Sequence, residues 1–308
     1  MKNIAGVDEV GRGPLAGPVV AAAVILPKEH NIIGLRDSKK LSKKKREELF
    51  PIILKKATAI GVGKVNVKTI DDINIRQATF NAMNMALERL PVIPDRALID
   101  GHPLKDIIIP NEGIIGGDNK IESIMAASII AKVTRDNIME EYATIFHEYG
   151  FERHSGYGTK YHLDALKKHR ATPIHRRSFN PVKKNMPTIR WLKENDKLDW
   201  MCEKLAALYL RSKGMTIIEM YDSGTDIIII GKKEDEIVLA KVYSISTFDE
   251  RLSETLMENI KADRLKKCYI DAKDAYAEYS NIRTDTLFVK LNNNKYPNIK
   301  HFRGIKLN

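Results

Sequence analysis

Short apolar blocks and longer amphipathic blocks alternate along the first 188 residues of the chain. The short blocks lack helical spacing and are rich in Val, Ile and Ala, which predicts β-strands. We expect these strands at 3–10, 19–26, 57–67, 96–100, 107–109 and 113–115. The longer blocks predict helices after a cap at Ser42 and over 70–90, 121–149 and 159–169. This alternation predicts an α/β domain in which helices flank a mixed sheet.

A change of composition divides the chain near residue 188. Residues 180–190 combine two prolines with clustered charge, which is typical of a linker. Beyond it the alternation restarts, with helices expected at 191–213 and 249–261 and strands at 215–220, 225–231, 236–244, 268–270 and 286–290. We therefore predict two domains, 1–188 and 189–308, of which the second is a smaller α/β domain.

The chain of 308 residues has a net charge of +11, and the excess is concentrated in its first part. Residues 1–188 hold 30 Lys and Arg against 21 Asp and Glu, whereas residues 189–308 hold 21 against 19. A basic first part favours a polyanion such as nucleic acid as a partner, although a generally basic soluble protein has the same excess.

Composition also indicates the compartment. No apolar run reaches the roughly 18 residues that a membrane span needs. The start of the chain leads directly into a strand-like segment rather than a signal peptide. The two cysteines, Cys202 and Cys268, lack the spacing of metal ligands or of a disulfide framework. These features predict a cytoplasmic protein without a membrane partner.

The first predicted strand ends in two adjacent carboxylates, Asp8 and Glu9. Acidic side chains beside a buried strand are costly unless a cation neutralises them, and Mg²⁺ and Mn²⁺ prefer carboxylate oxygens. Gly11, Arg12 and Gly13 follow, and glycines let the backbone approach a ligand closely. A metal beside such a loop indicates chemistry on a nucleic-acid backbone.

Two further acids occupy comparable places. Asp100 ends a short apolar strand, and Asp118 follows two glycines just before a predicted helix. Because ligands collect at the strand ends of an open sheet, the four carboxylates could hold two divalent ions for displacement at phosphorus. Any one of these acids taken alone is more often a turn or cap residue.

Several motifs in the first 188 residues resemble ribonuclease HII, the bacterial and archaeal type 2 ribonuclease H. In chain order they are GVDEVGRGPLAGPVVAAAV at 6–24, RDSKKLS at 36–42, LIDG at 98–101, GGDNK at 116–120, AASIIAKVTRD at 126–136, HSGYGTK at 154–160 and PIHRRSF at 173–179. The resemblance implies a ribonuclease H-like fold. It also implies that Asp8, Glu9, Asp100 and Asp118 are catalytic carboxylates that bind two Mg²⁺ or Mn²⁺ ions.

The same resemblance implies how the substrate is recognised. Gly11, Arg12 and Gly13 match the loop that recognises the ribose 2′-hydroxyl, the group that distinguishes RNA from DNA. Tyr157 matches a tyrosine at the RNA–DNA junction, whose ring would stack on the deoxyribose that follows the ribonucleotide. For Tyr157 the alternative is an ordinary half-buried aromatic residue.

Four further residues are expected to contact the nucleic-acid backbone, namely Lys39 in DSKKLS and His175, Arg176 and Ser178 in PIHRRSF. Lys39 also belongs to a run of lysines that a solvated helix face would explain. Arg135 could serve either the structure or phosphate binding, and the sequence leaves both roles open.

Parts of the stretch 199–244 resemble the YraN-like family of endonuclease-fold proteins, which implies a restriction-endonuclease-like type of domain. Glu203 and Asp226 match two acids of that family, but Lys241 and Tyr243 stand where its Glu-x-Lys pair is expected. Because Lys241 would repel a metal ion there, we expect a domain that does not cleave. It could bind nucleic acid or a protein partner, or serve as a stabilising or oligomerising appendage.

The expected activity is that of an endoribonuclease acting on the RNA strand of RNA–DNA hybrids and cutting 5′ of ribonucleotides embedded in duplex DNA. The resemblance implies 3′-hydroxyl and 5′-phosphate ends and a setting in ribonucleotide excision repair and DNA replication. One alternative is a DNA resolvase or general nuclease on the same fold, and another is a binding protein without catalysis. The glycine loop and Tyr157 favour the ribonuclease, because a DNA enzyme has no 2′-hydroxyl to recognise.

Overall fold

The computed structural model describes residues 3–35, 41–105, 107–222, 227–247, 262–292 and 297–304. The chain divides into two compact units. The first unit comprises Met1–Glu140 and Phe151–Asn185, and the second unit comprises Glu141–Gly150 and Met186–Asn308. Residues 141–150 therefore group with the second unit, which a single division at residue 188 does not anticipate.

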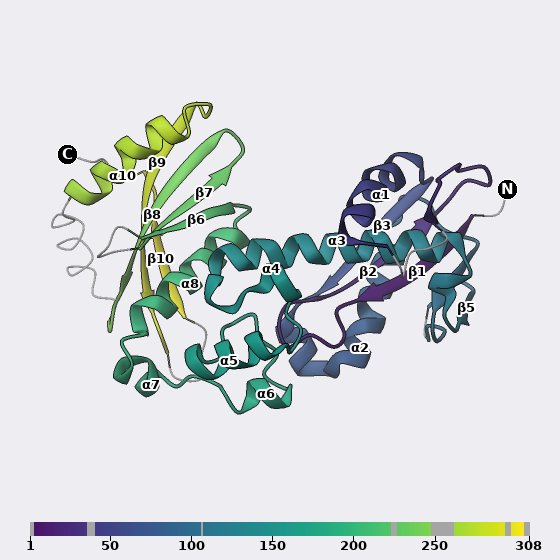
Figure 1. Cartoon of the computed structure of the whole chain (residues 1–308), viewed down its shortest axis with the longest axis horizontal. Helices are drawn as coiled ribbons and strands as arrows, with labels where there is room; N and C mark the ends of the chain where they lie inside the picture. The colour runs from purple at the N-terminus through teal and green to yellow at the C-terminus, as the bar shows by residue number, and fades with distance from the viewer. Residues whose placement is uncertain are drawn as a thin grey trace. The chain divides into compact units, whose positions relative to one another are not determined.

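A five-stranded mixed sheet lies within the first unit, in the strand order β3-β2-β1-β4-β5 (Figure 1). Its strands are β1 (Ile4–Val10), β2 (Val19–Ile25), β3 (Ala59–Val65), β4 (Arg96–Asp100) and β5 (Asn111–Ile114). Strand β2 pairs antiparallel with both β1 and β3, whereas β4 runs parallel to β1 and to β5. The predicted mixed sheet with flanking helices is confirmed for this unit.

Helices α2 (Val67–Glu88) and α3 (Glu122–Ile145) approach the sheet closely, at two glycines. A Cβ atom on Gly63 of β3 would lie 1.9 Å from the carbonyl oxygen of Ala82 in α2. A Cβ atom on Gly6 of β1 would lie 2.2 Å from the carbonyl carbon of Ser123 in α3. A side chain at either position would collide with a helix backbone, so these glycines set the helix-to-sheet distance on both faces.

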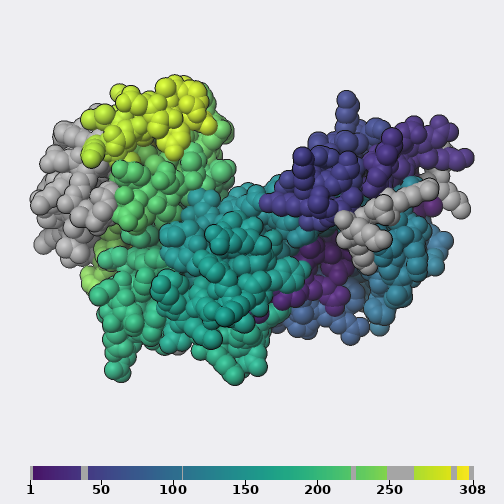
Figure 2. Space-filling model, viewed as in Figure 1, coloured from purple at the N-terminus to yellow at the C-terminus, as the bar shows by residue number. Residues whose placement is uncertain are grey.

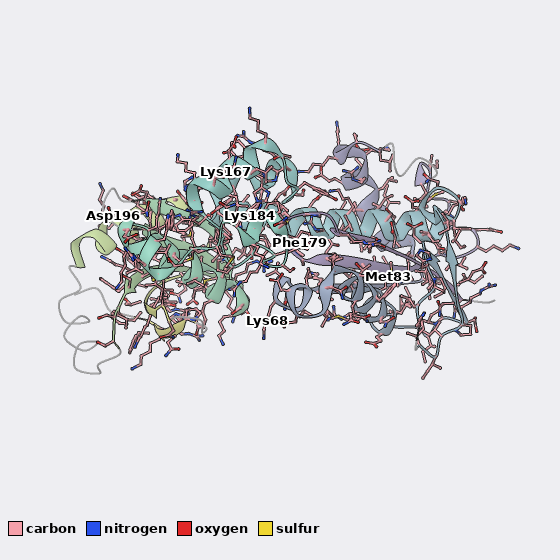
Figure 3. All side chains as sticks on the ribbon, turned by 90° about the horizontal axis from the view of Figure 1, so that it is seen from below. Lys68, Met83, Lys167, Phe179, Lys184 and Asp196 are labelled. Atoms are coloured by element: carbon pink, nitrogen blue, oxygen red, sulfur yellow. The ribbon has the colours of Figure 1, made fainter. Side chains whose placement is uncertain are left out.

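The core between α2 and the sheet is built from small and medium apolar side chains. Met83 of α2 is 2% exposed within it, and the ring of Phe179 packs against the same core (Figure 3). The other helical segments described in this unit are α1 (Lys43–Lys56), the 3₁₀ turn η2 (Gly117–Asn119), α4 (Phe151–His154), α5 (Lys160–His169) and α6 (Asn180–Lys183).

Side-chain caps begin α1 and α2, as Thr159 also does for α5. The Ser42 hydroxyl accepts a hydrogen bond from the Lys45 N–H at 3.2 Å, so the predicted cap of α1 is confirmed. Helix α2 starts before the predicted residue 70, because Asn66 caps it by accepting from the Thr69 N–H at 3.0 Å. Asn74 interrupts α2 with a positive φ of 67°.

The predicted strand at 107–109 is wrong. These residues form a bend, and the side chain of Ile108 is exposed. The strand begins only after Pro110, at Asn111, whose side chain accepts from the Leu104 N–H at 2.7 Å and donates to the Leu104 carbonyl at 3.2 Å. The Asn111 amide thus replaces the backbone pairing that a strand would have supplied.

A second five-stranded sheet lies within the second unit, in the strand order β10-β9-β8-β7-β6. Its strands are β6 (Thr216–Asp222), β7 (Ile227–Lys233), β8 (Glu236–Ser244), β9 (Asn281–Lys290) and β10 (Asn298–Phe302). Neighbouring strands are antiparallel except for β8 and β9, which are parallel. The described helical segments of this unit are η3 (His147–Tyr149), α7 (Ile189–Glu194), α8 (Leu198–Ser212) and α10 (Ala262–Ala275).

Two predictions for the second unit differ from the structure, and a third cannot be compared with it. The helix predicted over 191–213 is divided into α7 and α8, and Asp196 between them has a positive φ of 51°. The strand predicted at 268–270 lies inside α10, where Cys268 is buried against the sheet core and Ile270 is exposed. Three apolar residues are too few to distinguish a strand from a helix face. The helix predicted at 249–261 falls outside the described residues.

Helix α10 lies at the surface of the second unit (Figure 2).

None of the helices in the described parts of the chain combines the length and the apolar character that crossing a bilayer requires.

A buried ion pair joins residues 141–150 to helix α8 in the second unit. Lys204 Nζ lies 3.2 Å from Glu148 Oε1, and the Trp200 indole N–H donates to the same oxygen at 2.6 Å. The Lys204 side chain is 3% exposed and that of Glu148 is 12% exposed. Burial alone would raise the pKa of Glu148, but Lys204 and Trp200 outweigh it and lower that pKa.

Replacing Lys204 by Met should therefore destabilise the protein strongly at neutral pH. The Glu148 carboxylate would remain buried without its cation, and removal of one partner of a buried pair costs about 3–5 kcal/mol. Urea unfolding would measure the loss, which should shrink at pH values low enough to protonate Glu148. Arg190→Met, which removes an exposed pair with Glu194, should cost less than about 1 kcal/mol. Equal losses in the two variants would contradict this prediction.

Candidate functional site

Three of the predicted carboxylates meet at one edge of the first sheet. Asp8 lies near the carboxyl end of β1 and Asp100 at the carboxyl end of β4, and these two strands are parallel neighbours. Asp118 lies in η2, beside Asp100, because Asp100 Oδ1 accepts from the Gly117 N–H at 2.7 Å. Carboxyl ends of parallel strands are where open sheets collect ligands. The fourth acid, Glu9, directly follows Asp8.

The acids at this edge repel one another. Burial, with further contributions from Glu9 and Asp100, raises the pKa of Asp8 to about 8, although a hydrogen bond from Ser128 opposes the rise. Burial also raises the pKa of Glu9, although Arg12, with Nη1 3.4 Å from Glu9 Oε1, partly opposes this. Too little positive charge therefore lies near these carboxylates to balance them, and a bound cation would reduce their repulsion.

Among the residues that the structure describes, no three His, Cys, Asp or Glu side chains stand so that together they could hold a metal ion. Successive residues of a strand point to opposite faces, so Asp8 and Glu9 leave β1 in different directions. The donor chemistry still fits a hard divalent cation, because the groups are carboxylates whose burial, and to a smaller extent mutual repulsion, disfavours the charged state that such a cation would stabilise.

The glycine loop that follows β1 lies against the predicted tyrosine. Gly11 has a positive φ of 93°, and a Cβ atom there would lie 2.3 Å from Arg135 Nε. A Cβ atom on Gly13 would lie 3.5 Å from Tyr157 Cε1, and the Tyr157 side chain is 43% exposed. The fold thus brings together the loop and the ring that the sequence places about 140 residues apart.

Arg176 holds this loop from inside. Its guanidinium donates to the carbonyl oxygens of Arg12 at 2.8 Å, of Gly11 at 2.5 Å and of Gly17 at 3.0 Å. The prediction that Arg176 contacts the nucleic-acid backbone is therefore corrected, because its side chain is fully buried. Burial, together with the charge of Arg135, lowers the pKa of Arg176 to about 9.

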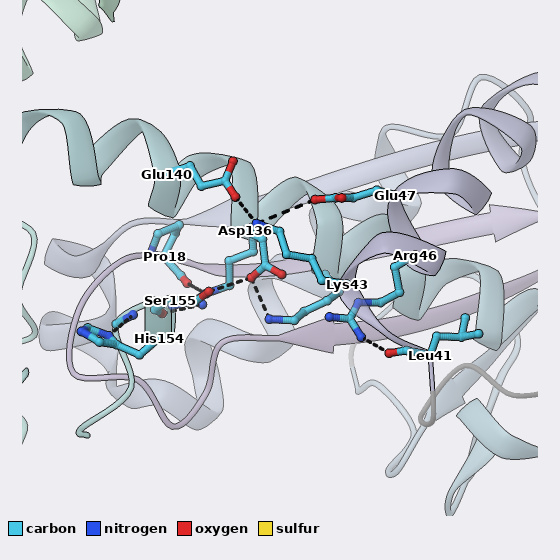
Figure 4. A network of polar contacts seen from close by, with 12 residues as sticks. Pro18, Leu41, Lys43, Arg46, Glu47, Asp136, Glu140, His154 and Ser155 are labelled. Atoms are coloured by element: carbon cyan, nitrogen blue, oxygen red, sulfur yellow. Dashed lines mark hydrogen bonds and ion pairs between the residues drawn. The ribbon is translucent and has the colours of Figure 1, made fainter. Parts of the chain in front are cut away.

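The sequence left open whether Arg135 of α3 serves the structure or binds phosphate, and its contacts are structural. Arg135 donates to the carbonyl oxygens of Pro18 at 3.0 Å and Ala16 at 3.1 Å, and to that of Ser155 at 2.9 Å. Figure 4 shows Pro18 and Ser155 close together, beside Asp136. Arg135 therefore ties the glycine loop to the segment that carries the predicted tyrosine. Its neighbour Asp136 accepts from the Ser155 hydroxyl at 2.9 Å and strengthens the same connection.

The other three predicted backbone contacts have different outcomes. His175 is buried at 1% exposure, so the prediction that it touches nucleic acid is also corrected. Ser178 donates through its hydroxyl to Asp71 Oδ1 at 2.6 Å and through its N–H to the same atom at 2.9 Å. These bonds fasten the 172–178 segment to α2, and because Ser178 is exposed, its contact with nucleic acid stays a prediction. Lys39 lies outside the described residues.

In the second unit, the residues of the predicted degenerate nuclease site lie on α8 and β8. Glu203 belongs to α8, whereas Lys241 and Tyr243 belong to β8, with Lys241 Nζ 5.1 Å from the centre of the Tyr243 ring. The Tyr243 ring stacks on Phe288 with centroids 5.5 Å apart. Asp226 lies outside the described residues.

Sequence reasoning missed a buried charged cluster in the same unit. Asp285 is fully buried and accepts from Arg283 Nε at 2.8 Å and from the N–H of Gly304 at 3.0 Å, with His301 Nε2 at 2.8 Å. Arg283 and His301 also line a cavity of about 430 Å³. Its wall carries both acids and bases, which indicates no preference for one sign of charge.

Comparison with known proteins gives a consistent result for the first unit. A family model described as Ribonuclease HII matches residues 5–182. The ribonuclease HII of Enterococcus faecalis is 58% identical over 180 residues, which cover 58% of this chain and 70% of the relative. That of Ligilactobacillus salivarius is 55% identical over 184 residues, covering 60% of this chain and 72% of the relative.

Solved structures point the same way. The ribonuclease H2 from Pyrococcus horikoshii OT3 is similar with a TM-score of 0.51 and 30% identity, over 59% of this chain and 96% of that chain. The RNase HII in a complex with PCNA from Archaeoglobus fulgidus has a TM-score of 0.50 and 28% identity, over 58% of this chain and 95% of that chain.

Two alanine substitutions in the glycine loop should behave differently. Gly11→Ala combines a positive φ with a clash against Arg135 and should cost about 1–3 kcal/mol of stability. Gly13→Ala places its methyl group at ordinary contact distance from Tyr157 and should change stability by less than about 0.5 kcal/mol. Urea unfolding of the two variants measures the difference, and equal stabilities would contradict the described loop geometry.

Proposed function

Because the chain belongs to the ribonuclease HII family, we propose that its first unit hydrolyses the RNA strand of RNA–DNA hybrids and also cuts 5′ of single ribonucleotides in duplex DNA. Membership of this family makes the protein a ribonuclease H. The proposal adds the cleavage position, the 3′-hydroxyl and 5′-phosphate products, and a role for two metal ions. It also places the protein in the cytoplasm, in ribonucleotide excision repair and DNA replication.

The acidic edge would hold the ions. Asp8, Glu9, Asp100 and Asp118 supply carboxylate oxygens, which suit Mg²⁺ or Mn²⁺. Bound divalent ions would activate a water molecule and stabilise the leaving 3′ oxygen. Asp100 is oriented for this task by the Gly117 N–H, which occupies one side of its carboxylate. Asp8 is oriented by the Glu9 N–H, which donates to Asp8 Oδ1 at 2.7 Å.

Recognition of ribose would fall to the glycine loop and Tyr157. The closeness of Gly13 to the Tyr157 ring, whose Cε1 atom lies 3.5 Å from where a Cβ atom on Gly13 would be, is the observation that carries this proposal. A 2′-hydroxyl can be tested only by groups that come within hydrogen-bond distance, and glycine backbone meets that requirement. The half-exposed ring beside it provides a surface on which the next deoxyribose could stack. Arg12 is exposed on the same loop and could approach a phosphate.

Two alternatives predict different substrates. A DNA resolvase or general nuclease would cut duplex DNA with and without a ribonucleotide equally well. A binding protein without catalysis would cut neither. The loop and ring favour the ribonuclease, because the loop directly follows the strand that carries Asp8 and Glu9, and a loop that tests a 2′-hydroxyl there would place a ribose next to the scissile phosphate.

Asp8→Asn and Asp100→Asn should each lower kcat on a duplex containing one ribonucleotide by about 100-fold or more. Replacing a residue that only hydrogen-bonds to a metal ligand already lowers activity by about 10–100-fold. Asp8 and Asp100 are proposed as direct ligands, so their loss should cost at least as much. Affinity for the same duplex, measured without metal, should stay within about threefold, because the fold and the glycine loop are unchanged.

The control is Asp164→Asn, which removes an exposed carboxylate on α5 and should leave kcat unchanged. An all-DNA duplex of the same sequence is the substrate control. Cleavage that survives either active-site change would contradict the roles of the acids, and equal cutting of the two duplexes would contradict the ribonuclease proposal.

For the second unit we propose a module that binds nucleic acid or a protein partner without cleaving. The order α8, β6, β7, β8, α10, β9 places Lys241 on the third strand, where a nuclease of this kind needs an acid for its cation. A stabilising or oligomerising appendage is the alternative. A nucleic-acid role requires a basic surface, and Lys241 with its neighbouring aromatic rings is the candidate.

Lys241→Gln should weaken binding of the full chain to an RNA–DNA hybrid and reduce the slope of log affinity against log salt by about 1, if Lys241 meets a phosphate. Lys193→Gln, an exposed charge on α7, serves as the matched control. An unchanged affinity and slope in Lys241→Gln would remove this nucleic-acid role and favour the appendage.

A further inference from the structure

Behind Tyr157 lies a cluster of three histidine rings, which we call the histidine cluster: His154, His162 and His175. The rings surround Phe151, with centroid distances of 5.9, 5.4 and 5.8 Å respectively. His162 and His175 are buried at 0% and 1% exposure, and His154 stacks on His162 at 4.9 Å with nearly parallel planes. The proposed chemistry assigns none of these rings a task.

Hydrogen-bond chemistry fixes the proton on each of the two buried rings. His175 Nδ1 accepts from the Thr172 N–H at 3.1 Å, because a backbone N–H can only donate. The proton of neutral His175 is therefore on Nε2, which donates to His162 Nε2 at 3.0 Å. His162 must then carry its proton on Nδ1, which donates to the carbonyl oxygen of Tyr157 at 2.9 Å. One directed chain of hydrogen bonds runs from Thr172 to Tyr157.

The surroundings maintain this arrangement. Both rings must be neutral, since a second proton on either ring would place two donors against each other. Burial lowers the pKa of His162 to about 4, and burial together with His162 lowers that of His175. The Thr172 hydroxyl, 2.8 Å from His175 Nδ1, donates to the same acceptor and reinforces the tautomer.

The position of the Tyr157 ring depends on its backbone. The Tyr157 N–H donates to the His154 carbonyl at 2.9 Å, and the Tyr157 carbonyl accepts from the Thr159 N–H at 2.8 Å and from His162. Tyr157 is 43% exposed, so part of its ring faces solvent rather than packing against the protein. The orientation of the peptide group at Tyr157 therefore decides where the ring meets the substrate.

We propose that His162 and His175 are positioning residues for Tyr157, which set how the enzyme recognises the junction between a ribonucleotide and the deoxyribonucleotide that follows it. This inference rests on the proposed function of Tyr157. The segments HSGYGTK and PIHRRSF act together here, the first by presenting the tyrosine and the second by supplying His175, which fixes the tautomer of His162. In this proposal, the residues that position Tyr157 for recognition of the junction are different from the acids that carry out cleavage.

The test compares two variants of nearly equal shape in the full-length protein. His162→Leu removes the donor to the Tyr157 carbonyl, whereas His162→Asn keeps an N–H near the position of Nδ1. The readout is kcat/KM on a duplex with one ribonucleotide divided by kcat/KM on a continuous RNA–DNA hybrid. A continuous hybrid has no junction, so this ratio reports on Tyr157 rather than on general folding.

His162→Leu should lower the ratio by about threefold to tenfold, and His162→Asn should restore most of it. Tyr157→Ala should lower the ratio by about tenfold, the scale of one lost stacking contact. In the Tyr157→Ala background, His162→Leu should produce no further fall, because the two changes remove the same interaction. Thr172→Val, which deletes only the hydroxyl donor to His175, is a milder variant and should lower the ratio by about twofold or less.

The outcomes separate the two proposals. If Tyr157→Ala leaves the ratio unchanged, the proposed function of Tyr157 fails. If Tyr157→Ala lowers the ratio but His162→Leu does not, the function stands and the positioning role is overturned. A ratio that falls equally in His162→Leu and His162→Asn would also overturn it, because the retained donor would then have no effect.

Discussion

Two buried guanidinium groups hold the glycine loop and the segment before Tyr157, to which we assign recognition of the substrate. Arg135 and Arg176 are fully buried, and both donate to backbone carbonyl oxygens of the segment between Gly11 and Pro18. An unpaired polar group in such a place would be strongly destabilising, so each guanidinium requires the loops in their observed positions. The path of the glycine loop is thus coupled to the stability of the interior.

This coupling would let the loops carry out the recognition of ribose that we propose for them. A single hydroxyl is discriminated only if the groups that test it are held to within a fraction of an ångström. Arg135 reaches Ser155 as well as the glycine loop, and His162 reaches the carbonyl of Tyr157. Interior side chains therefore hold the segments of both exposed groups, Gly13 and the Tyr157 ring, which lie close to each other.

The charged groups at the acidic edge interact with one another less favourably than the two buried arginines do with their carbonyl partners. There the side chains Asp8, Glu9 and Asp100 destabilise one another, and the pKa of Asp8 is raised to about 8 as a result of burial and like charge. A site with this repulsion gains most from a divalent cation, because the ion removes the repulsion as it binds. The first unit therefore combines loops held by buried cations with a group of buried acids that a bound cation would stabilise.

The sequence by itself determined the features that depend on local pattern and residue type. It predicted the strand that carries Asp8, the cap at Ser42 and the mixed α/β class. Periodicity and capping depend only on residues that are close in sequence. Its motifs also identified the family. These features need no knowledge of what lies far away in the chain.

Only the tertiary structure decided which polar residues face solvent and which are buried. From the sequence, Arg176 and His175 are expected to contact phosphate, since basic residues are usually exposed. In the structure both are buried, because segments distant in sequence cover them. The roles of Arg135 and His162 likewise depend on carbonyl groups brought near them by folding. Burial is a property of the whole arrangement of segments, so no local pattern could have revealed it.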